Sequence, residues 1–179
     1  ILEALRDPER VGLIAQSGPP FMFWPPRALF AIGEDRAALD MMRSRYSRFL
    51  RMGLDTFCET WAWTCASGDW NTRYRSLAQN GAGSPAWLLA TEVLGVRPTK
   101  PGFAEFELAP QPGDLEWAEG VVPSPKGDIP VKWTRHGGEF RLEVTVPKET
   151  KALVRLPGGK ESIPLMPGSH SVGGIRETR

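Results

Sequence analysis

The residues of this chain best suited to chemistry are one acid and the aromatic side chains beside it. Glu59 lies two residues after Phe57 and two residues before Trp61, and Trp63 follows. Aromatic rings desolvate a neighbouring carboxyl group, and their faces bind the apolar C–H face of a sugar ring. Glycosidases use two carboxyl groups, one to protonate the leaving oxygen and one as base or nucleophile. The pattern predicts that Glu59 is a catalytic residue of a glycosidase.

The same residues also fit a structural role. Glu59 would then stand at the start of a helix or on the surface, while its aromatic neighbours pack in a core. Acids with shifted pKa values also occur in purely structural networks. These residues alone leave both interpretations open.

Three other groups of residues carry weaker signals. Asp69 and Trp70 suit contact with a polar ligand, but Gly-Asp and Asn-rich sequence is first of all turn-forming. His136 and His170 are predicted at a hairpin tip and beside a turn, too isolated for a metal site or a nucleophile–base pair. The glycine-rich residues 81–84 precede a helix but lack the lysine and the preceding strand of a phosphate-binding loop. None of these groups is predicted to be catalytic.

The charges and the cysteines exclude several classes of function. The 22 Lys and Arg residues nearly balance the 21 Asp and Glu residues, and no long run of one sign would attract nucleic acid or an acidic membrane. Cys58 and Cys65 are too few for a disulfide scaffold or a zinc site of four cysteines. We therefore predict no metal, no cofactor, no nucleic-acid partner and no membrane partner.

The first residues point to a longer polypeptide. Residues 1–6 contain no Met and lack the basic-then-apolar layout of a secretion signal, and no apolar run in the chain is long enough to cross a bilayer. We expect the chain to continue an upstream part of the same polypeptide, and the sequence assigns no compartment.

Helices are predicted before Pro98. Apolar residues recur every three or four positions over residues 35–51, with charged residues between them, which predicts an amphipathic helix. Its predicted apolar face comprises Leu39, Met42, Tyr46, Phe49 and Leu50, and its polar face Asp40, Arg43, Arg45 and Arg48. A second helix is predicted over residues 84–95, with a serine to cap it, a proline in its first turn and a glycine to end it. A shorter helix is predicted over residues 27–32, and residues 54–83, which lack clean periodicity, are expected to form a binding-site loop.

After Pro98 the apolar residues alternate, which predicts strands. The expected strands lie around residues 103–108, 115–122, 129–133, 140–146 and 152–156. The third and fourth of them form a hairpin around His136-Gly137-Gly138. We therefore expect two domains, a helical one over residues 1–98 and an antiparallel β-sandwich over residues 99–179.

The order of these pieces resembles the C-terminal part of the bacterial α-L-rhamnosidases, the six-hairpin enzymes of glycoside hydrolase family 78. The resemblance covers nearly the whole chain and rests on four stretches. These are FMFWPPRALFAIGEDRAALDMMRSRYSRFL, LDTFCETW, SLAQNGAGSPAWLLATEVLGVRPTKPGF and LAPQPGDLEWAEGVVPSPKGDIPVKW.

The resemblance implies a fold and a mechanism. The helical half would close an (α/α)6 barrel whose central cleft binds a terminal rhamnose, and hydrolysis would invert the anomeric centre. Glu59 matches the general base of the family. Its partner, the general acid, would lie upstream of this chain at ~6.5–9.5 Å from it. Trp61, Trp63, Trp70 and Gln79 are expected near the sugar.

One departure from the family pattern leaves alternatives open. Related sequences often have a histidine, and a tryptophan two residues later, where this chain has Gln79-Asn80-Gly81. Gln79 can bind a hydroxyl group, but it cannot carry a proton as imidazole does. The alternatives to an exo-α-L-rhamnosidase are a non-catalytic carbohydrate-binding relative and a six-hairpin hydrolase with another sugar specificity.

Overall fold

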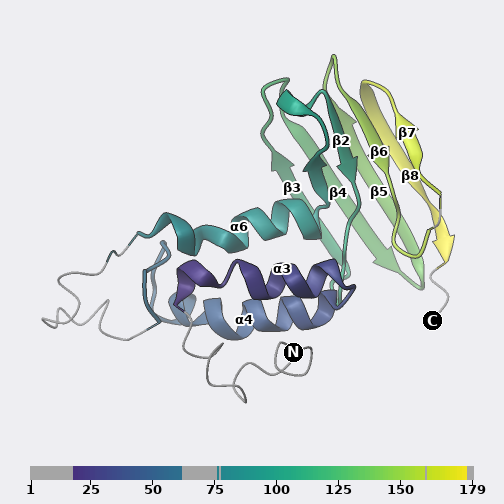
Figure 1. Cartoon of the computed structure of the whole chain (residues 1–179). Helices are drawn as coiled ribbons and strands as arrows, with labels where there is room; N and C mark the ends of the chain where they lie inside the picture. Colours follow the sequence, from purple (N-terminus) through teal and green to yellow (C-terminus); the bar gives the residue numbers. More distant parts are fainter. Residues whose placement is uncertain (1–17, 62–75, 77, 160, 177–179) are drawn as a thin grey trace, which may run out of the picture. The chain divides into compact units, whose positions relative to one another are not determined.

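The structure, a computed structural model, describes residues 18–61, 76, 78–159 and 161–176. The chain divides into two compact units, residues 1–88 and residues 89–179. The described part of the first unit is helical, and the second is made mainly of strands (Figure 1). Helices followed by mostly antiparallel sheets confirm the predicted fold class in outline. The described residues do not contain a closed barrel.

Two antiparallel helices dominate the first unit. They are α3 (Trp24–Ala31) and α4 (Asp35–Arg51), which pack against each other (Figure 1). The chain reverses between them at Gly33, whose φ of +77° favours glycine. Helix α4 has the predicted bounds, with an acid in its first turn and arginines in its last, as the helix dipole favours. Helix α3 begins three residues earlier than predicted, because its two prolines fit the first turn.

The buried face of α4 differs from the prediction at two positions. Leu50 was assigned to the apolar face but is 74% exposed. Arg45 was assigned to the polar face but is only 8% exposed. The residues that α4 buries instead include Ala38 and Met41, so the face that packs is rotated from the one that the spacing indicated.

Short 3₁₀ turns precede two helices of the first unit. The 3₁₀ turn η1 (Pro19–Phe21) precedes α3, and the 3₁₀ turn η3 (Asn80–Gly83) leads into α6 (Ser84–Leu88). The helix continues in the second unit as a π-helix, η4 (Leu89–Val93), in which the Leu94 N–H donates to the Leu89 carbonyl at 2.8 Å. The two units therefore divide at Leu88, within the predicted helix of residues 84–95, whereas the sequence placed the boundary at Pro98.

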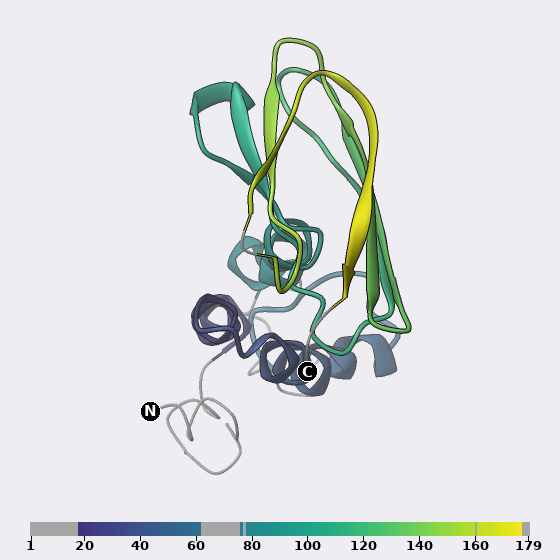
Figure 2. The same cartoon turned by 90° about the vertical axis from the view of Figure 1, so that its right-hand side faces the viewer.

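The second unit contains two four-stranded sheets that face each other (Figure 2). The first sheet has the order β1 (Val96–Pro98), β2 (Glu105–Leu108), β6 (Lys151–Val154) and β7 (Ile163–Leu165). The second has the order β3 (Trp117–Val122), β4 (Ile129–His136), β5 (Glu139–Val146) and β8 (Gly168–Arg176). The predicted hairpin is confirmed, since β4 and β5 pair up to His136↔Glu139 around two glycines with positive φ.

The strands also correct the prediction in detail. Strand β2 pairs with β6 in parallel, so the sandwich is not wholly antiparallel. Phe103 lies outside the strand predicted for it, in the 3₁₀ turn η5 (Pro101–Phe103), with a φ of +57°. The strands β1, β7 and β8 were not predicted.

The core of the sandwich centres on Trp133 of β4. Its side chain is fully buried and stacks on Phe140 with 5.3 Å between the ring centroids. Its indole N–H donates to the Val93 carbonyl at 2.9 Å, so the polar atom of this large apolar side chain is satisfied. The hydrogen bond fixes the end of η4 against the second sheet.

A buried ion network joins η4 to the first sheet. Arg97 lies 2.7 Å from Oε2 of Glu92 and 3.0 Å from Oε2 of Glu107. Gln111 donates to the same Glu92 oxygen at 2.8 Å, and Arg155 pairs with Glu107. Because buried carboxylates are costly unless paired, this network commits η4, β1 and β2 to one arrangement.

Gly95, just after η4, allows a close approach of two backbones. Its φ is +83°, and a Cβ at this position would lie 2.3 Å from the carbonyl carbon of Ala109. The Ala109 N–H donates to the Gly95 carbonyl at 2.9 Å. Any residue with a side chain would separate these strand ends.

Candidate active site

Glu59 lies on a segment that is hydrogen-bonded to the chain around Ser76. The Glu59 N–H donates to the Ser76 carbonyl at 3.0 Å, and the Ser76 N–H donates to Oε2 of Glu59, also at 3.0 Å. Next to this pair, the Gln79 N–H donates to the Phe57 carbonyl at 2.8 Å. Residues 57–59 therefore lie beside Ser76 and Gln79, and these bonds bring the predicted base and the predicted sugar ligand Gln79 onto adjacent segments.

A third segment, at Gly18 and η1, reaches the same place. A Cβ built on Gly18 would lie 3.3 Å from the Glu59 carbonyl oxygen, and one built on Gly81 would lie 3.2 Å from Cβ of Pro20. Both distances are tighter than ordinary contact, so glycine allows the three segments to converge. We call the three segments, residues 18–21, residues 57–61, and residue 76 with residues 78–83, the Glu59 junction.

An aromatic cluster underlies the Glu59 junction. Tyr46 and Phe49 of α4 meet Phe57 and Trp61, which stand on either side of Glu59. The Trp61 ring stacks on Phe49 with 5.4 Å between centroids and 19° between planes, and it meets Tyr46 edge-on at 5.2 Å. One face of the Trp61 indole is thus covered by Phe49. The backbone carbonyl of Trp61 accepts a hydrogen bond from Arg48 at 3.2 Å.

The hydroxyl group of Tyr46 makes two polar contacts below this junction. It lies 2.8 Å from Oγ of Ser84 and donates to the Pro19 carbonyl at 3.4 Å. Burial raises the pKa of the Tyr46 phenol above its ordinary value of 10.0, while the hydrogen bond with Ser84 offsets part of the rise. The phenol therefore stays protonated near neutral pH. Ser84 is already helical and uses its hydroxyl here, not as the helix cap that the sequence predicted.

The structure accounts for the predicted site residues as follows. Glu59, Trp61 and Gln79 lie at the Glu59 junction, each partly buried. Trp63 and Trp70 lie outside the described residues, as do Asp69 and Cys65. Cys58 is a buried thiol.

The sequence did not indicate that three further residues contact the Glu59 junction, namely Gly18, Tyr46 and Ser76. Gly18 precedes two prolines, which is a turn signal, but nothing in the sequence shows that the turn lies against Glu59. Tyr46 was read as one member of an apolar stripe, and Ser76 carried no signal.

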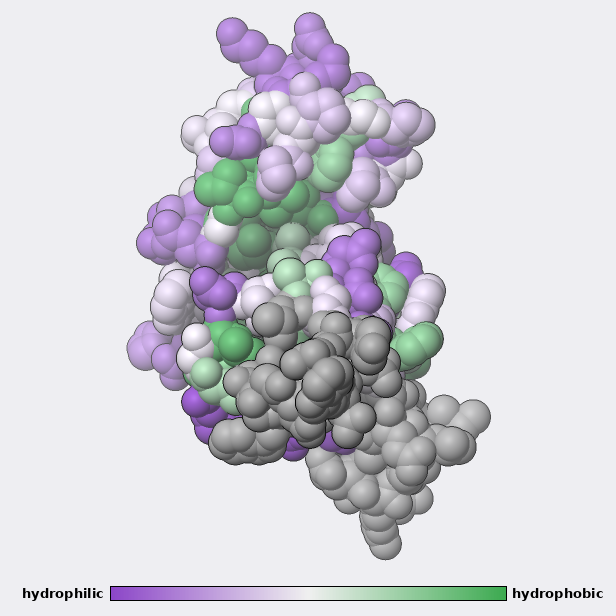
Figure 3. Space-filling view, turned by 90° about the vertical axis from the view of Figure 1, so that its left-hand side faces the viewer, coloured by the Kyte–Doolittle hydropathy of each residue, from purple (hydrophilic) through white to green (hydrophobic). Residues whose placement is uncertain are grey.

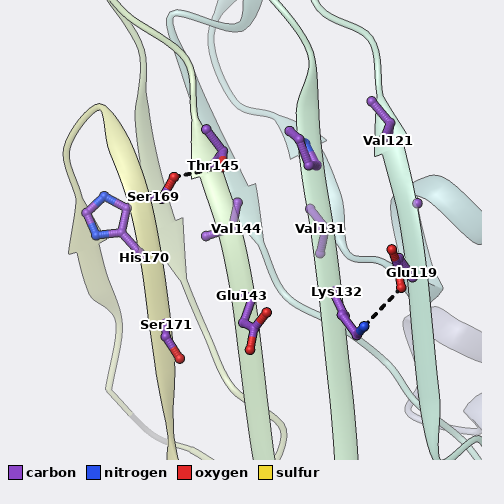
Figure 4. Close-up of a pocket in the computed structure, with 12 residues that line it drawn as sticks. Glu119, Val121, Val131, Lys132, Glu143, Val144, Thr145, Ser169, His170 and Ser171 are labelled. Atoms are coloured by element: carbon purple, nitrogen blue, oxygen red, sulfur yellow. Dashed lines mark hydrogen bonds and ion pairs between the residues drawn. The ribbon is translucent and has the colours of Figure 1, made fainter.

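A hollow lies on the outer face of the second sheet and is lined by none of the residues of the Glu59 junction (Figure 4). It has a volume of about 740 Å³, and a row of paired residues crosses it, with Glu119 opposite Lys132, Lys132 opposite Glu143, and Glu143 opposite Ser171. Lys132 pairs with Glu119 at 3.2 Å, and the hydroxyl groups at positions 145 and 169 lie 3.1 Å apart. These side chains satisfy one another, as on an ordinary solvent-facing sheet, and we assign no function to this hollow.

Aromatic side chains also gather at the surface of the first unit. Phe23 meets Trp24 and Trp87 edge-on at 4.9 and 5.0 Å, and the Arg27 guanidinium lies over the rings of Phe23 and Trp87. Trp24 is 62% exposed. Figure 3 shows one face of the molecule, on which the largest hydrophobic area lies in the upper part of the view and is bordered by hydrophilic side chains.

No described helix combines the length and the apolar character needed to span a bilayer. Among the same residues, no three or more His, Cys, Asp or Glu side chains are grouped so as to hold a metal ion.

Comparisons with known proteins agree on one group of enzymes. Residues 95–170 match the family model described as the bacterial α-L-rhamnosidase C-terminal domain. The α-L-rhamnosidase of Alteromonas sp. (strain LOR) is 46% identical over 56 residues, which are 31% of this chain and 6% of that protein.

Solved structures show the same relationship over more of the chain. The native α-L-rhamnosidase from Aspergillus terreus matches with a TM-score of 0.75 and 27% identity, over 85% of this chain and 18% of that one. The family 78 rhamnosidase of Bacillus sp. GL1 matches with a TM-score of 0.68 and 33% identity, over 79% of this chain and 15% of that one. The chain therefore spans less than a fifth of the length of each of these relatives.

The relatives that share this succession of helices and sheets are glycosidases. Within that class, the chain is similar to the C-terminal portion of the α-L-rhamnosidases, and the similarity of residues 95–170 is to the bacterial α-L-rhamnosidase C-terminal domain.

Proposed function

We propose that this chain is part of an inverting exo-α-L-rhamnosidase that removes terminal rhamnose from glycans or glycosides, with Glu59 as its general base. The helices of the first unit then form the last part of an (α/α)6 barrel, and the second unit is a non-catalytic sandwich. The observation that carries the proposal is the junction of three segments at Glu59, where a carboxylate is held beside aromatic side chains. Relatives of this chain are α-L-rhamnosidases.

The Ser76 N–H gives the Glu59 carboxylate a fixed orientation. A hydrogen bond to Oε2 at 3.0 Å, from a residue whose carbonyl also accepts the Glu59 N–H, ties the side chain and its own backbone to one neighbour. A general base needs this kind of constraint, because it must meet a water molecule at hydrogen-bond distance and in line with the anomeric carbon.

In the proposed reaction, Glu59 takes a proton from water as the water oxygen bonds to the anomeric carbon. The bond from that carbon to the leaving oxygen breaks, and an acid from the upstream part of the same polypeptide protonates the leaving oxygen. Inverting enzymes separate the two carboxyl groups by ~6.5–9.5 Å to leave room for the water.

We assign sugar contacts to Gln79, Trp61, Trp63 and Trp70. Gln79 is on the segment bonded to Phe57, and its amide can both donate to and accept from sugar hydroxyls. Trp61 offers only the part of its ring not committed to Phe49 and Tyr46.

The second candidate function is a non-catalytic carbohydrate-binding protein on the same scaffold. The observation in its favour is Gln79-Asn80-Gly81, which lacks an imidazole where related sequences often have one. A hydrolase with another sugar specificity is a variant of the first proposal, and a panel of aryl glycosides distinguishes it.

The test compares three forms of the full-length protein that carries this chain, the parent, Glu59→Gln and Glu139→Gln. Glu139 is an exposed acid of β5, so its variant controls for the loss of one carboxylate. We expect Glu59→Gln to fold normally and to lower the turnover of an aryl α-L-rhamnoside by about 10²–10⁴-fold, and Glu139→Gln to keep the parental rate. Proton NMR of the first sugar released reads its anomeric configuration. Parental turnover in Glu59→Gln would remove this residue from the mechanism, and an inactive parent that binds rhamnosides would favour the second candidate.

A further inference from the structure

Tyr46 of α4 contacts two segments of the Glu59 junction and Ser84, the residue that follows the third. Its hydroxyl group donates to the Pro19 carbonyl at 3.4 Å in the first segment. Its ring meets Phe57 and Trp61, in the second segment, edge-on at 5.6 and 5.2 Å. The same hydroxyl lies 2.8 Å from Oγ of Ser84, the residue at which the third segment becomes α6.

The two ring contacts bracket Glu59. Phe57 and Trp61 stand two residues before and two residues after it, so one side chain holds the backbone on both sides of the carboxylate. Tyr46 is only 7% exposed and sits on a helix of 17 residues, which makes it a rigid support. Phe49, one turn along the same helix, contacts Phe57 and Trp61 but has no polar atom to reach the other two segments.

The hydroxyl contacts have a single consistent direction. Because Tyr46 donates its proton to Pro19, its oxygen is left to accept the proton of Ser84. A chain of hydrogen bonds thus runs from Ser84 through Tyr46 to Pro19, next to Pro20, which contacts Gly81.

We infer that Tyr46 is a positioning residue, which sets the place of the Glu59 carboxylate through its ring contacts and its Ser84–Tyr46–Pro19 hydrogen bonds. The inference rests on the proposed function of Glu59. It adds a residue whose effect on catalysis passes through Glu59 and requires no contact with the sugar.

The test is a double-variant cycle in the full-length protein with 4-nitrophenyl α-L-rhamnopyranoside as substrate. The variants are Tyr46→Phe, Glu59→Gln and the two together. Tyr46→Phe removes one oxygen atom and keeps the ring. The matched control is Thr150→Val, which removes a buried hydroxyl that donates to the Pro147 carbonyl at 2.8 Å in the second unit. If Tyr46→Phe does not fold, Ser84→Ala removes the same hydrogen bond from its other end.

We expect Tyr46→Phe to lower kcat about tenfold with KM within about twofold of the parent, because misplacing a catalytic group slows the chemical step more than binding. Thr150→Val should lower the melting temperature by about as much as Tyr46→Phe does, but it should leave kcat unchanged. In the Glu59→Gln background, Tyr46→Phe should have no further effect on kcat, since the group that it positions is gone.

Three outcomes would overturn the inference while leaving Glu59 in place. They are an unchanged kcat in Tyr46→Phe, an equal loss of kcat in Thr150→Val, and a full additional loss in the double variant. Failure of the proposed function gives a different result, because Glu59→Gln alone would then keep parental turnover.

Discussion

Glu59 and Ser76 bond to each other twice, once between their backbones and once from the Ser76 N–H to the Glu59 carboxylate, both at 3.0 Å. Residues that are far apart in the sequence therefore share one rigid link. The carboxylate that is proposed to do chemistry takes its orientation from a main-chain group, which cannot rotate away as a side chain can.

Removing that main-chain donor should impair Glu59 without changing any acid. Ser76→Pro deletes the N–H, and we expect kcat for an aryl rhamnoside to fall about tenfold, the value of one hydrogen bond to a charged group. Ser76→Ala keeps the N–H and is the control, although it loses the Oγ that accepts the Ala78 N–H at 3.2 Å. Equally reduced rates in the two variants would assign the effect to the serine hydroxyl, and a parental rate in Ser76→Pro would show that the backbone donor does not matter.

Breaking the ion network of the second unit should lower the free energy of unfolding more than breaking an ion pair at its surface does. Arg97→Ala leaves the Glu92 and Glu107 carboxylates, 7% and 11% exposed, with fewer partners. We expect a loss of about 2–4 kcal/mol in the free energy of unfolding, because Gln111 and Arg155 keep one bond to each acid. Lys132→Ala breaks an exposed pair with Glu119 and should cost at most about 1 kcal/mol. Urea denaturation of both variants makes the comparison, and equal losses would contradict it.

The raised pKa of Tyr46 should appear in the alkaline stability of the protein. Burial is the main cause of the rise, so the folded state holds the phenol proton to a higher pH than the unfolded state does. The contribution of this phenol to the free energy of unfolding is fully present below its unfolded pKa of about 10. That contribution is lost as the pH rises from there through the folded pKa. Tyr46→Phe has no phenol to titrate, so its free energy of unfolding should fall less steeply above pH ~10 than that of the parent. Parallel curves in denaturation at several pH values would show that Tyr46 does not contribute.

The sequence predicts those parts of the fold that depend on local spacing. The bounds of α4 and the β4–β5 hairpin follow from periodicity and from two adjacent glycines. The side of α4 that packs does not follow, because Arg45 and Leu50 are placed by what lies next to the helix and not by the helix itself.

The sequence indicated Glu59, Trp61 and Gln79 but not the residues that support them. Glu59 and its aromatic neighbours are adjacent in the sequence, which made them visible together. Gly18, Tyr46 and Ser76 reach Glu59 through long-range contacts, and no spacing rule connects them. The parallel partner of β2 was missed for the same reason.

From that parallel pair we expect an order of assembly in the sandwich. Strand β2 needs β6, with Glu105 opposite Lys151, and the whole run of β3, β4 and β5 lies between them in the chain. Within this run, β3 pairs with β4 and β4 pairs with β5, both antiparallel. The loops that join these strands are therefore short. The meander can therefore form before β2 pairs with β6, and we expect closure of the first sheet to be the late, slow step of folding. Until β6 has been synthesised, the edge of β2 that pairs with it has no native partner, and we expect it to be open to wrong pairing.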